Sequence, residues 1–162
     1  MINPSVLAEY FSRNVEIVKL QTAGMTQEES LIQLSFRANC MNWILGHLVT
    51  NRNSILKLLN REDLIDNTSV KRYERELEPI TGPGEGILAI EELIRLLEQP
   101  QSHIRQLLSE MSEEELSRQV AFFGNRSRSV AEWLFFFYFH DTYHTGQTEI
   151  LRQAAGKNDK II

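Results

Sequence analysis

The sequence predicts an all-α protein, an antiparallel four-helix bundle with long connections. Apolar residues recur at intervals of three, four or seven in four long segments, which is typical of helices with one buried face. Capping-box patterns that mark helix starts begin at Thr26, Ser112 and Ser129. No segment predicts an extensive sheet. The 162 residues form a single predicted domain, residues 1–162, with enough chain for a sizeable core.

The first helix is predicted over residues 5–22. Asn3-Pro4-Ser5 is typical of a helix start, with proline in the first turn, and Gly24 is a suitable stop. Thr26 and Glu29 have the spacing of a capping box, which favours a short helical turn within residues 25–38.

The second helix is predicted over residues 39–59. His47 lies inside it, with Trp43 one turn before and Asn51 one turn after on the same face. The connection that follows, residues 60–86, is polar and ends in the Gly- and Pro-rich sequence EPITGPGEG. A connection this long in a compact domain is often functional.

The third helix is predicted from about Gly86 to Met111, and Pro100 lies in its middle. Proline removes a backbone hydrogen bond and clashes with the preceding turn, so two helices are one interpretation. The apolar positions nevertheless stay in phase across Pro100. We therefore expect one long helix that is kinked near Glu98 to Pro100.

The fourth helix is predicted from the capping box of Ser129 and Glu132 to about Ala155, with Gly156 as its stop. Before it, Gly124-Asn125 separates short β-prone segments, which indicates a small hairpin or an extended loop. The tail KNDKII is expected to be loose.

Composition and charge exclude several classes of protein. The net charge of −5 argues against a general phosphate-binding surface, so we expect no nucleic-acid partner. We expect no membrane partner, because no apolar run reaches the roughly 18 residues of a membrane span and the N-terminus lacks signal-peptide features. Cys40 is the single cysteine, so no intrachain disulfide can form. This fits a reducing compartment, and we expect a cytoplasmic protein.

His140 and His144 are the strongest candidates for chemistry. They follow an aromatic run in FFFYFHDTYHTGQ, and their spacing of four places both imidazoles on one helical face. Two such histidines can share a metal ion, but most divalent metal sites need a third protein ligand. No glutamate stands between them as in an HExxH zinc motif, so two structural histidines are the alternative.

His47 could supply the third ligand if the second and fourth helices are neighbours, because bundle sites use inward-facing side chains of adjacent helices. Three neutral imidazoles suit zinc or nickel and leave a fourth position for water. A water or thiol at that position would ionise more readily and provide a nucleophile at neutral pH. A lone histidine on an apolar face is, however, more often a hydrogen-bonded core residue.

The other polar candidates have simpler interpretations. His103 lies off the apolar stripe and is expected at the surface. Asp141 is expected to be a surface group or to support a ligand, and Cys40 to be a small buried hydrophobe. The aromatic run is expected to be mainly core, with Phe135 and Phe139 pointing away from the histidine face.

Two segments carry a resemblance to a known family. NWILGHLVTNR in the second helix and HDTYHTGQTEILRQ in the fourth match a helix-two histidine followed by H-x-x-x-H-x-G-Q near the C-terminus. In these motifs, in the order of helices and in the long connection after helix two, nearly the whole chain resembles the DinB/YfiT-like family of bacterial metal-binding four-helix bundles. The resemblance implies that His47, His140 and His144 ligate one divalent metal.

The resemblance implies less about activity, because a fold does not select a chemistry. Many family members are described as metal-dependent hydrolases. Others resemble thiol S-transferases that use low-molecular-weight thiols such as bacillithiol or mycothiol. We therefore expect the metal to activate a thiol or water for attack on a small electrophile, as part of a homodimer. The alternative is a non-catalytic dimeric metal-binding or stress-response protein.

Trp43, Asn51, Tyr143 and Gln147 are the candidates for lining a substrate pocket, chosen by helical spacing or proximity to the histidines. No general base can be named from the sequence. An open coordination position would favour an enzyme, whereas a fourth protein ligand would favour a structural metal.

Overall fold

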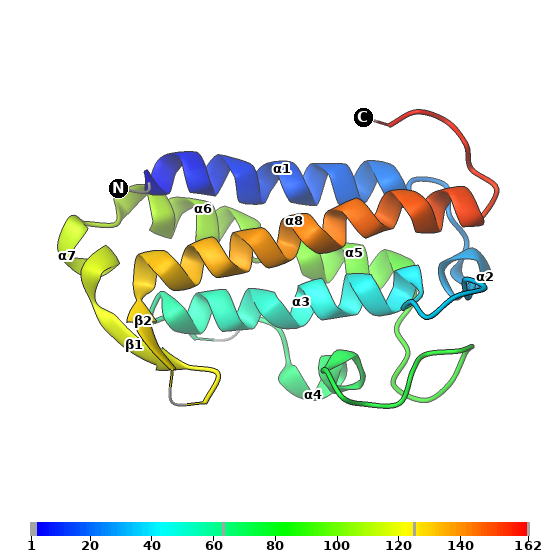
Figure 1. Ribbon diagram of the computed structural model, residues 1–162, viewed down its shortest axis with the longest axis horizontal. Coiled ribbons are helices and arrows are strands. Elements are labelled where there is room, and N and C mark those ends of the chain that lie inside the picture. Colours follow the sequence, from blue (N-terminus) through cyan, green and yellow to red (C-terminus); the bar gives the residue numbers. More distant parts are fainter. Residues whose placement is uncertain (1–2, 63, 125, 162) are drawn as a thin grey trace.

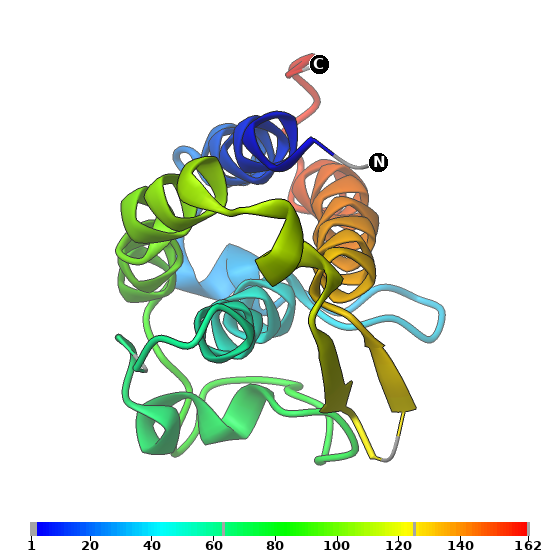
Figure 2. The same ribbon diagram turned by 90° about the vertical axis from the view of Figure 1, so that its left-hand side faces the viewer.

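Four long helical segments form a bundle, which confirms the predicted all-α class. The computed structural model describes residues 3–62, 64–124 and 126–161. The four corners of the bundle are α1 (Pro4–Thr22), α3 (Met41–Leu58), the pair α5 (Ile90–Glu98) and α6 (Gln101–Glu110), and α8 (Val130–Ala154) (Figures 1 and 2). None of the helices in the described part of the chain is long and apolar enough to cross a membrane.

The long connection after α3 sets the directions of the helices. It returns along the bundle, so α3 and the α5–α6 pair run in the same direction, opposite to α1 and α8 (Figure 1). Each corner is therefore antiparallel to one neighbour and parallel to the other, which refines the predicted antiparallel arrangement. Long crossovers of this kind permit parallel neighbours in helical bundles.

The predicted start and stop signals of the first helix are confirmed. The Asn3 side chain accepts hydrogen bonds from the backbone N–H groups of Ser5 and Val6, and Pro4 is the first helical residue. After the helix, Gly24 adopts a φ of +68°, which an L-residue with a side chain rarely adopts. The Thr26 capping box opens the short helix α2 (Gln27–Ser30).

The third predicted helix is divided into α5 and α6, so the expectation of one continuous helix is wrong. Pro100 has no N–H group to donate to the carbonyl one turn earlier, and the helix is interrupted at Gln99-Pro100. The predicted phase of the apolar positions is nevertheless correct, because the buried residues of both helices face the bundle. These residues are Ile90, Leu93, Leu96, Leu97, Ile104 and Leu108.

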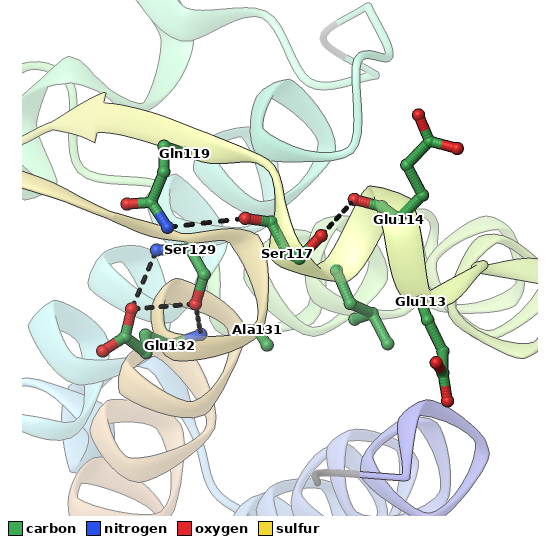
Figure 3. Close-up of a pocket in the computed structure, with 8 residues that line it drawn as sticks. Glu113, Glu114, Ser117, Gln119, Ser129, Ala131 and Glu132 are labelled. Carbon is green, nitrogen blue, oxygen red and sulfur yellow. Dashed lines mark hydrogen bonds between the residues drawn. The ribbon is translucent and has the colours of Figure 1, made fainter.

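Two short elements precede α8. The Ser112 capping box opens α7 (Glu113–Ser117), and a hairpin of β1 (Gln119–Phe122) and β2 (Arg126–Ser129) follows. The strands pair antiparallel with Gln119 opposite Ser129, so the hairpin alternative is confirmed, although Asn125 lies outside the described residues. Figure 3 shows the start of α8, where the Ser129 N–H and hydroxyl both donate to the Glu132 carboxylate.

The core has two apolar clusters with a polar layer between them. On α3, the first cluster ends at Val49 and the second begins at Ile55. On α8, the apolar cluster ends at Phe137 and the other resumes at Leu151. The buried residues between the two clusters are polar, which requires hydrogen-bonded or charged partners. His140 and His144 lie in this layer on α8, and His47 lies just before it on α3.

The segment after α3 covers one side of this polar layer. It contains α4 (Asn67–Val70) and a 3₁₀ turn, η1 (Lys71–Tyr73), both packed on α3. The buried Asn53 amide of α3 donates to the Ile65 carbonyl at 2.6 Å, which ties the segment to the helix.

The C-terminal tail is attached to the bundle, in contrast to the loose tail expected. The Arg152 guanidinium of α8 pairs with the Asp159 carboxylate at 2.9 Å and also donates to the backbone carbonyls of Gln21 and Ala23. This arrangement links the tail and the end of α1 to one buried side chain.

Candidate metal centre

Three histidines from two helices converge in the polar layer. His47 lies on α3, and His140 and His144 lie one turn apart on α8. The Nε2 atom of His140 is 3.2 Å from Nε2 of His47 and 3.2 Å from Nε2 of His144. All three residues form one group whose potential ligand atoms lie within 4.8 Å of one another.

The hydrogen bonds of the outer ring nitrogens orient two of the imidazoles. His47 Nδ1 lies 3.1 Å from the Tyr73 carbonyl oxygen, and His144 Nδ1 lies 2.7 Å from Gln147 Oε1. Both partners are acceptors, so each Nδ1 carries the proton and donates. In a neutral imidazole the other nitrogen then has a free lone pair, and both Nε2 atoms face the centre of the group.

Burial keeps these rings neutral. It lowers the pKa of His47 to about 4, with a smaller contribution from repulsion by His144. It also lowers the pKa of His140 to about 3, assisted by repulsion from the other two imidazoles. The pKa of His144 is lowered mainly by burial as well. Neutral imidazoles at pH 7 are the form that binds a metal.

The geometry of the three nitrogens fits a single divalent ion. Zinc binds histidine nitrogen at about 2.0–2.1 Å, and a tetrahedral angle then places two ligand nitrogens about 3.3 Å apart. The two Nε2–Nε2 distances of 3.2 Å agree with this separation. Facing lone pairs repel each other unless a cation or proton lies between them, so the donor set itself favours a cation.

Gly46 and Tyr73 together position the His47 ring. The Tyr73 side chain is fully buried against α3, and a Cβ atom at Gly46 would lie within 3.0 Å of its ring. The Tyr73 hydroxyl is also fixed, because it donates to Asn42 Oδ1 and accepts from the Leu88 N–H. The missing side chain at Gly46 thus allows the close approach that brings the Tyr73 carbonyl to His47 Nδ1.

A cavity of about 680 Å³ lies beside the histidines. His47, Asn51 and His140 contribute to its wall from α3 and α8, while residues 74–76 and the β1–β2 hairpin supply other parts. The aromatic side chains of Phe123, Trp133 and Phe136 also line it. One side of the histidine group therefore faces a space large enough for a small molecule.

The four predicted pocket residues take different positions around the histidines. Asn51 lines the cavity and donates from Nδ2 to the His47 carbonyl at 2.8 Å. Trp43 stacks on the His47 ring with centroids 4.6 Å apart. Gln147 accepts the hydrogen bond of His144, and Tyr143 is 58% exposed on the outer side of α8. Only Asn51 of the four is among the residues that line this cavity.

Several expectations about the neighbouring residues are also decided by the structure. His103 is exposed and Cys40 is buried, as predicted. Asp141 is fully buried and paired with Arg52, so its expected surface or ligand-supporting position is wrong. Phe135 and Phe139 are exposed, as their helical phase indicates.

The sequence reasoning missed the contribution of residues 73–76. Tyr73 orients His47 through its backbone carbonyl, which no side-chain motif records, and Glu74, Arg75 and Glu76 line the cavity. The available signal was the length of the irregular segment 60–86, which is typical of functional connections.

The fold and site define a helical-bundle protein with a three-histidine candidate metal centre shared by two helices. The chain matches the model of the DinB superfamily over residues 22–148 and belongs to this superfamily. Membership and the buried histidine group fit a metal-binding protein.

A solved structure described as "conserved protein of locus from Enterococcus faecalis" is similar along almost its whole length. The two share 17% sequence identity with a TM-score of 0.73, and the match covers 96% of this chain and 98% of the other. This likeness concerns the fold. The comparison with curated proteins produced no match.

Proposed function

We propose that this protein is a metal-dependent enzyme in which His47, His140 and His144 hold one divalent ion, zinc or nickel. The observation that carries the proposal is the open side of the histidine group, which faces the 680 Å³ cavity. Within the described residues, no cysteine, aspartate or glutamate joins the three histidines as a fourth ligand. Catalytic zinc sites typically combine three protein ligands with one open position.

The reaction that fits such a site is attack by a thiol or water on a small electrophile, as in a thiol S-transferase or a hydrolase. A bound ion supplies Lewis acidity, which makes a thiol or water in its free position ionise near neutral pH. The chain's own residues orient the rings, through Tyr73 and Gln147, and exclude water from the inner side by stacking Trp43 on His47. Phe136 and Trp133 give the cavity an apolar wall for the body of the substrate.

A turnover screen tests this function. The protein loaded with zinc or nickel is incubated with low-molecular-weight thiols paired with alkyl or epoxide electrophiles, and separately with simple esters and amides. We expect turnover in one of these sets and its loss in His144→Ala, while His103→Ala retains it because His103 is exposed on α6. Activity that is equal in His144→Ala would refute the proposed role of the site.

We also propose a homodimer that uses the outer face of α8. Phe135, Phe139, Tyr143 and Ile150 are all at least half exposed and lie on one side of this helix. Four large apolar side chains on one exposed face favour association with a self-complementary surface. Light scattering should give the mass of a dimer for the wild type and of a monomer for Phe139→Glu. A monomeric wild type at micromolar concentration would contradict the proposal.

A further inference from the structure

The cavity beside the histidines has a charge opposite to that of the whole protein. Its wall contains four cationic side chains but only two carboxylates, whereas the chain has a net charge of −5. The cations are Lys57, Arg75, Arg126 and Arg128, and the carboxylates are Glu74 and Glu76. Low-dielectric walls of one predominant charge concentrate the field within a cleft and attract ligands of the opposite charge.

Arg75 lies on the wall of the same cavity as His47 and His140. It follows Tyr73 by two residues, and Tyr73 is fixed by its buried ring and by the hydrogen bond from His47. The backbone that carries the Arg75 side chain is therefore held close to the histidine group.

Arg75 has no ion-pair partner among residues 3–62, 64–124 and 126–161, and neither Glu74 nor Glu76 pairs with it. A guanidinium presents several donors in a planar fork that matches carboxylate, sulfonate and phosphate oxygens. The guanidinium of Arg75 is thus available to bind an anionic ligand.

The hairpin places two further cations on the wall of the same cavity. Arg126 and Arg128 belong to β2, and the Arg128 guanidinium lies 5.0 Å from the centroid of the Trp133 ring. Cation–π contact of this kind holds an arginine in place without neutralising its charge. The four cations therefore come from three separate elements, α3, the segment after it and the hairpin, and aromatic rings line the same cavity.

We propose that this cavity binds a small molecule with an anionic oxygen group, which Arg75 recognises while the apolar part of the molecule lies on Phe136 and Trp133. The reacting end of the ligand then points to the histidines, and this part of the inference rests on the proposed function. The recognition of the anion by Arg75 does not depend on it. The acidic surface of the protein disfavours a polyanion such as nucleic acid, so the ligand class is small carboxylates, sulfonates or phosphates.

Matched ligands that differ only in charge test this inference. The zinc-loaded protein is titrated with 3-phenylpropionate and with the neutral isostere 3-phenylpropionamide, followed by chemical-shift changes in NMR spectra. We expect the carboxylate to bind at least about tenfold more tightly than the amide. In Arg75→Gln this preference should disappear while the affinity for the amide is unchanged. Arg105→Gln is the matched control, because Arg105 is exposed on α6 and does not line the cavity.

A second pair of ligands relates the anion to the metal. In the cobalt-substituted protein, 3-mercaptopropionate and 3-mercaptopropionamide are compared by the sulfur-to-cobalt charge-transfer absorption. The same preference, with the same loss in Arg75→Gln, supports the inference. Absence of the absorption with both thiols would count against thiol activation, and the phenylpropionate pair would still decide the anion preference. Equal affinities within the phenylpropionate pair, or a preference that persists in Arg75→Gln, overturn the inference.

Discussion

Arg52 and Asp141 form an ion pair in the interior of the bundle. Arg52 Nη1 lies 2.6 Å from Asp141 Oδ2, and 1% of each side chain is exposed. The pair joins α3 to α8 one residue beyond Asn51 and His140, and the Arg52 guanidinium also lies 5.7 Å from the Phe11 ring centroid of α1. Burial raises the pKa of Asp141, and the charge of Arg52 opposes this shift. The pair therefore aligns the two helices that carry the histidines.

Removal of one partner of this pair should destabilise the protein strongly. Asp141→Leu leaves a buried guanidinium without a counter-charge, and we expect the free energy of unfolding to fall by about 3–5 kcal/mol. Urea unfolding measures the change. The double variant Arg52→Met/Asp141→Leu should recover much of the loss, since it buries no charge. Glu16→Gln, in the exposed Arg13–Glu16 pair, is the control and should change stability by less than about 1 kcal/mol.

Metal content tests the histidine group directly. We expect the purified protein to bind one divalent ion per chain and His47→Ala to lose it, because two imidazoles from one helix leave too few protein ligands. Elemental analysis after dialysis gives the stoichiometry. His103→Ala should retain the ion, since His103 is exposed on α6. An unchanged metal content in His47→Ala would contradict the assignment of His47 as a ligand.

Gly46→Ala should disturb the site without touching a ligand. The new methyl group would collide with the Tyr73 ring, so the ring and its carbonyl must move away from His47. We expect a loss of about 1–3 kcal/mol of stability and at least about tenfold weaker metal binding, measured by competition with a chelator. Gly146→Ala on α8 is the matched control, because no atom lies within 4 Å of the added Cβ. Helix propensity predicts that this control is neutral or slightly stabilising.

Gln147 should act on the metal through His144. Gln147→Leu removes the acceptor that fixes the proton on His144 Nδ1, and metal affinity should fall by about 10–100-fold. Gln147→Glu keeps an acceptor at this position and should preserve the affinity. The exposed Gln153→Leu on the same helix serves as the control. Equal affinity in Gln147→Leu and wild type would show that this hydrogen bond does not support metal binding.

The metal-free protein should lose stability in mild acid. The folded-state pKa values of His47 and His140, about 4 and about 3, lie below the unfolded value near 6.5. Between these limits the unfolded chain binds more protons than the folded chain, so the free energy of unfolding falls as the pH drops below about 6.5. His47 alone should contribute on the order of 3 kcal/mol by pH 4. Urea unfolding from pH 7 to pH 4 should show a weaker decline in His47→Asn, and an equal decline would contradict the assignment.

The sequence by itself determined the helices and the candidate ligands. Helix starts at Asn3, Thr26 and Ser129 follow from local hydrogen bonds between residues two or three positions apart, and local spacing is visible in a sequence. The pairing of His140 with His144 follows equally from the period of one helix. His47 was predicted as the third ligand because of its place in a family motif.

The tertiary structure decided what lies between segments that are distant along the chain. The approach of Tyr73 to Gly46, the ion pair of Arg52 with Asp141 and the place of Arg75 on the cavity wall all depend on how separate elements pack. Asp141 illustrates the reason. Its position on α8 is fixed by the helical period, but its burial depends on α3 and α1 lying against that face. Helical periodicity specifies which side chains share a face, and only packing specifies what that face meets.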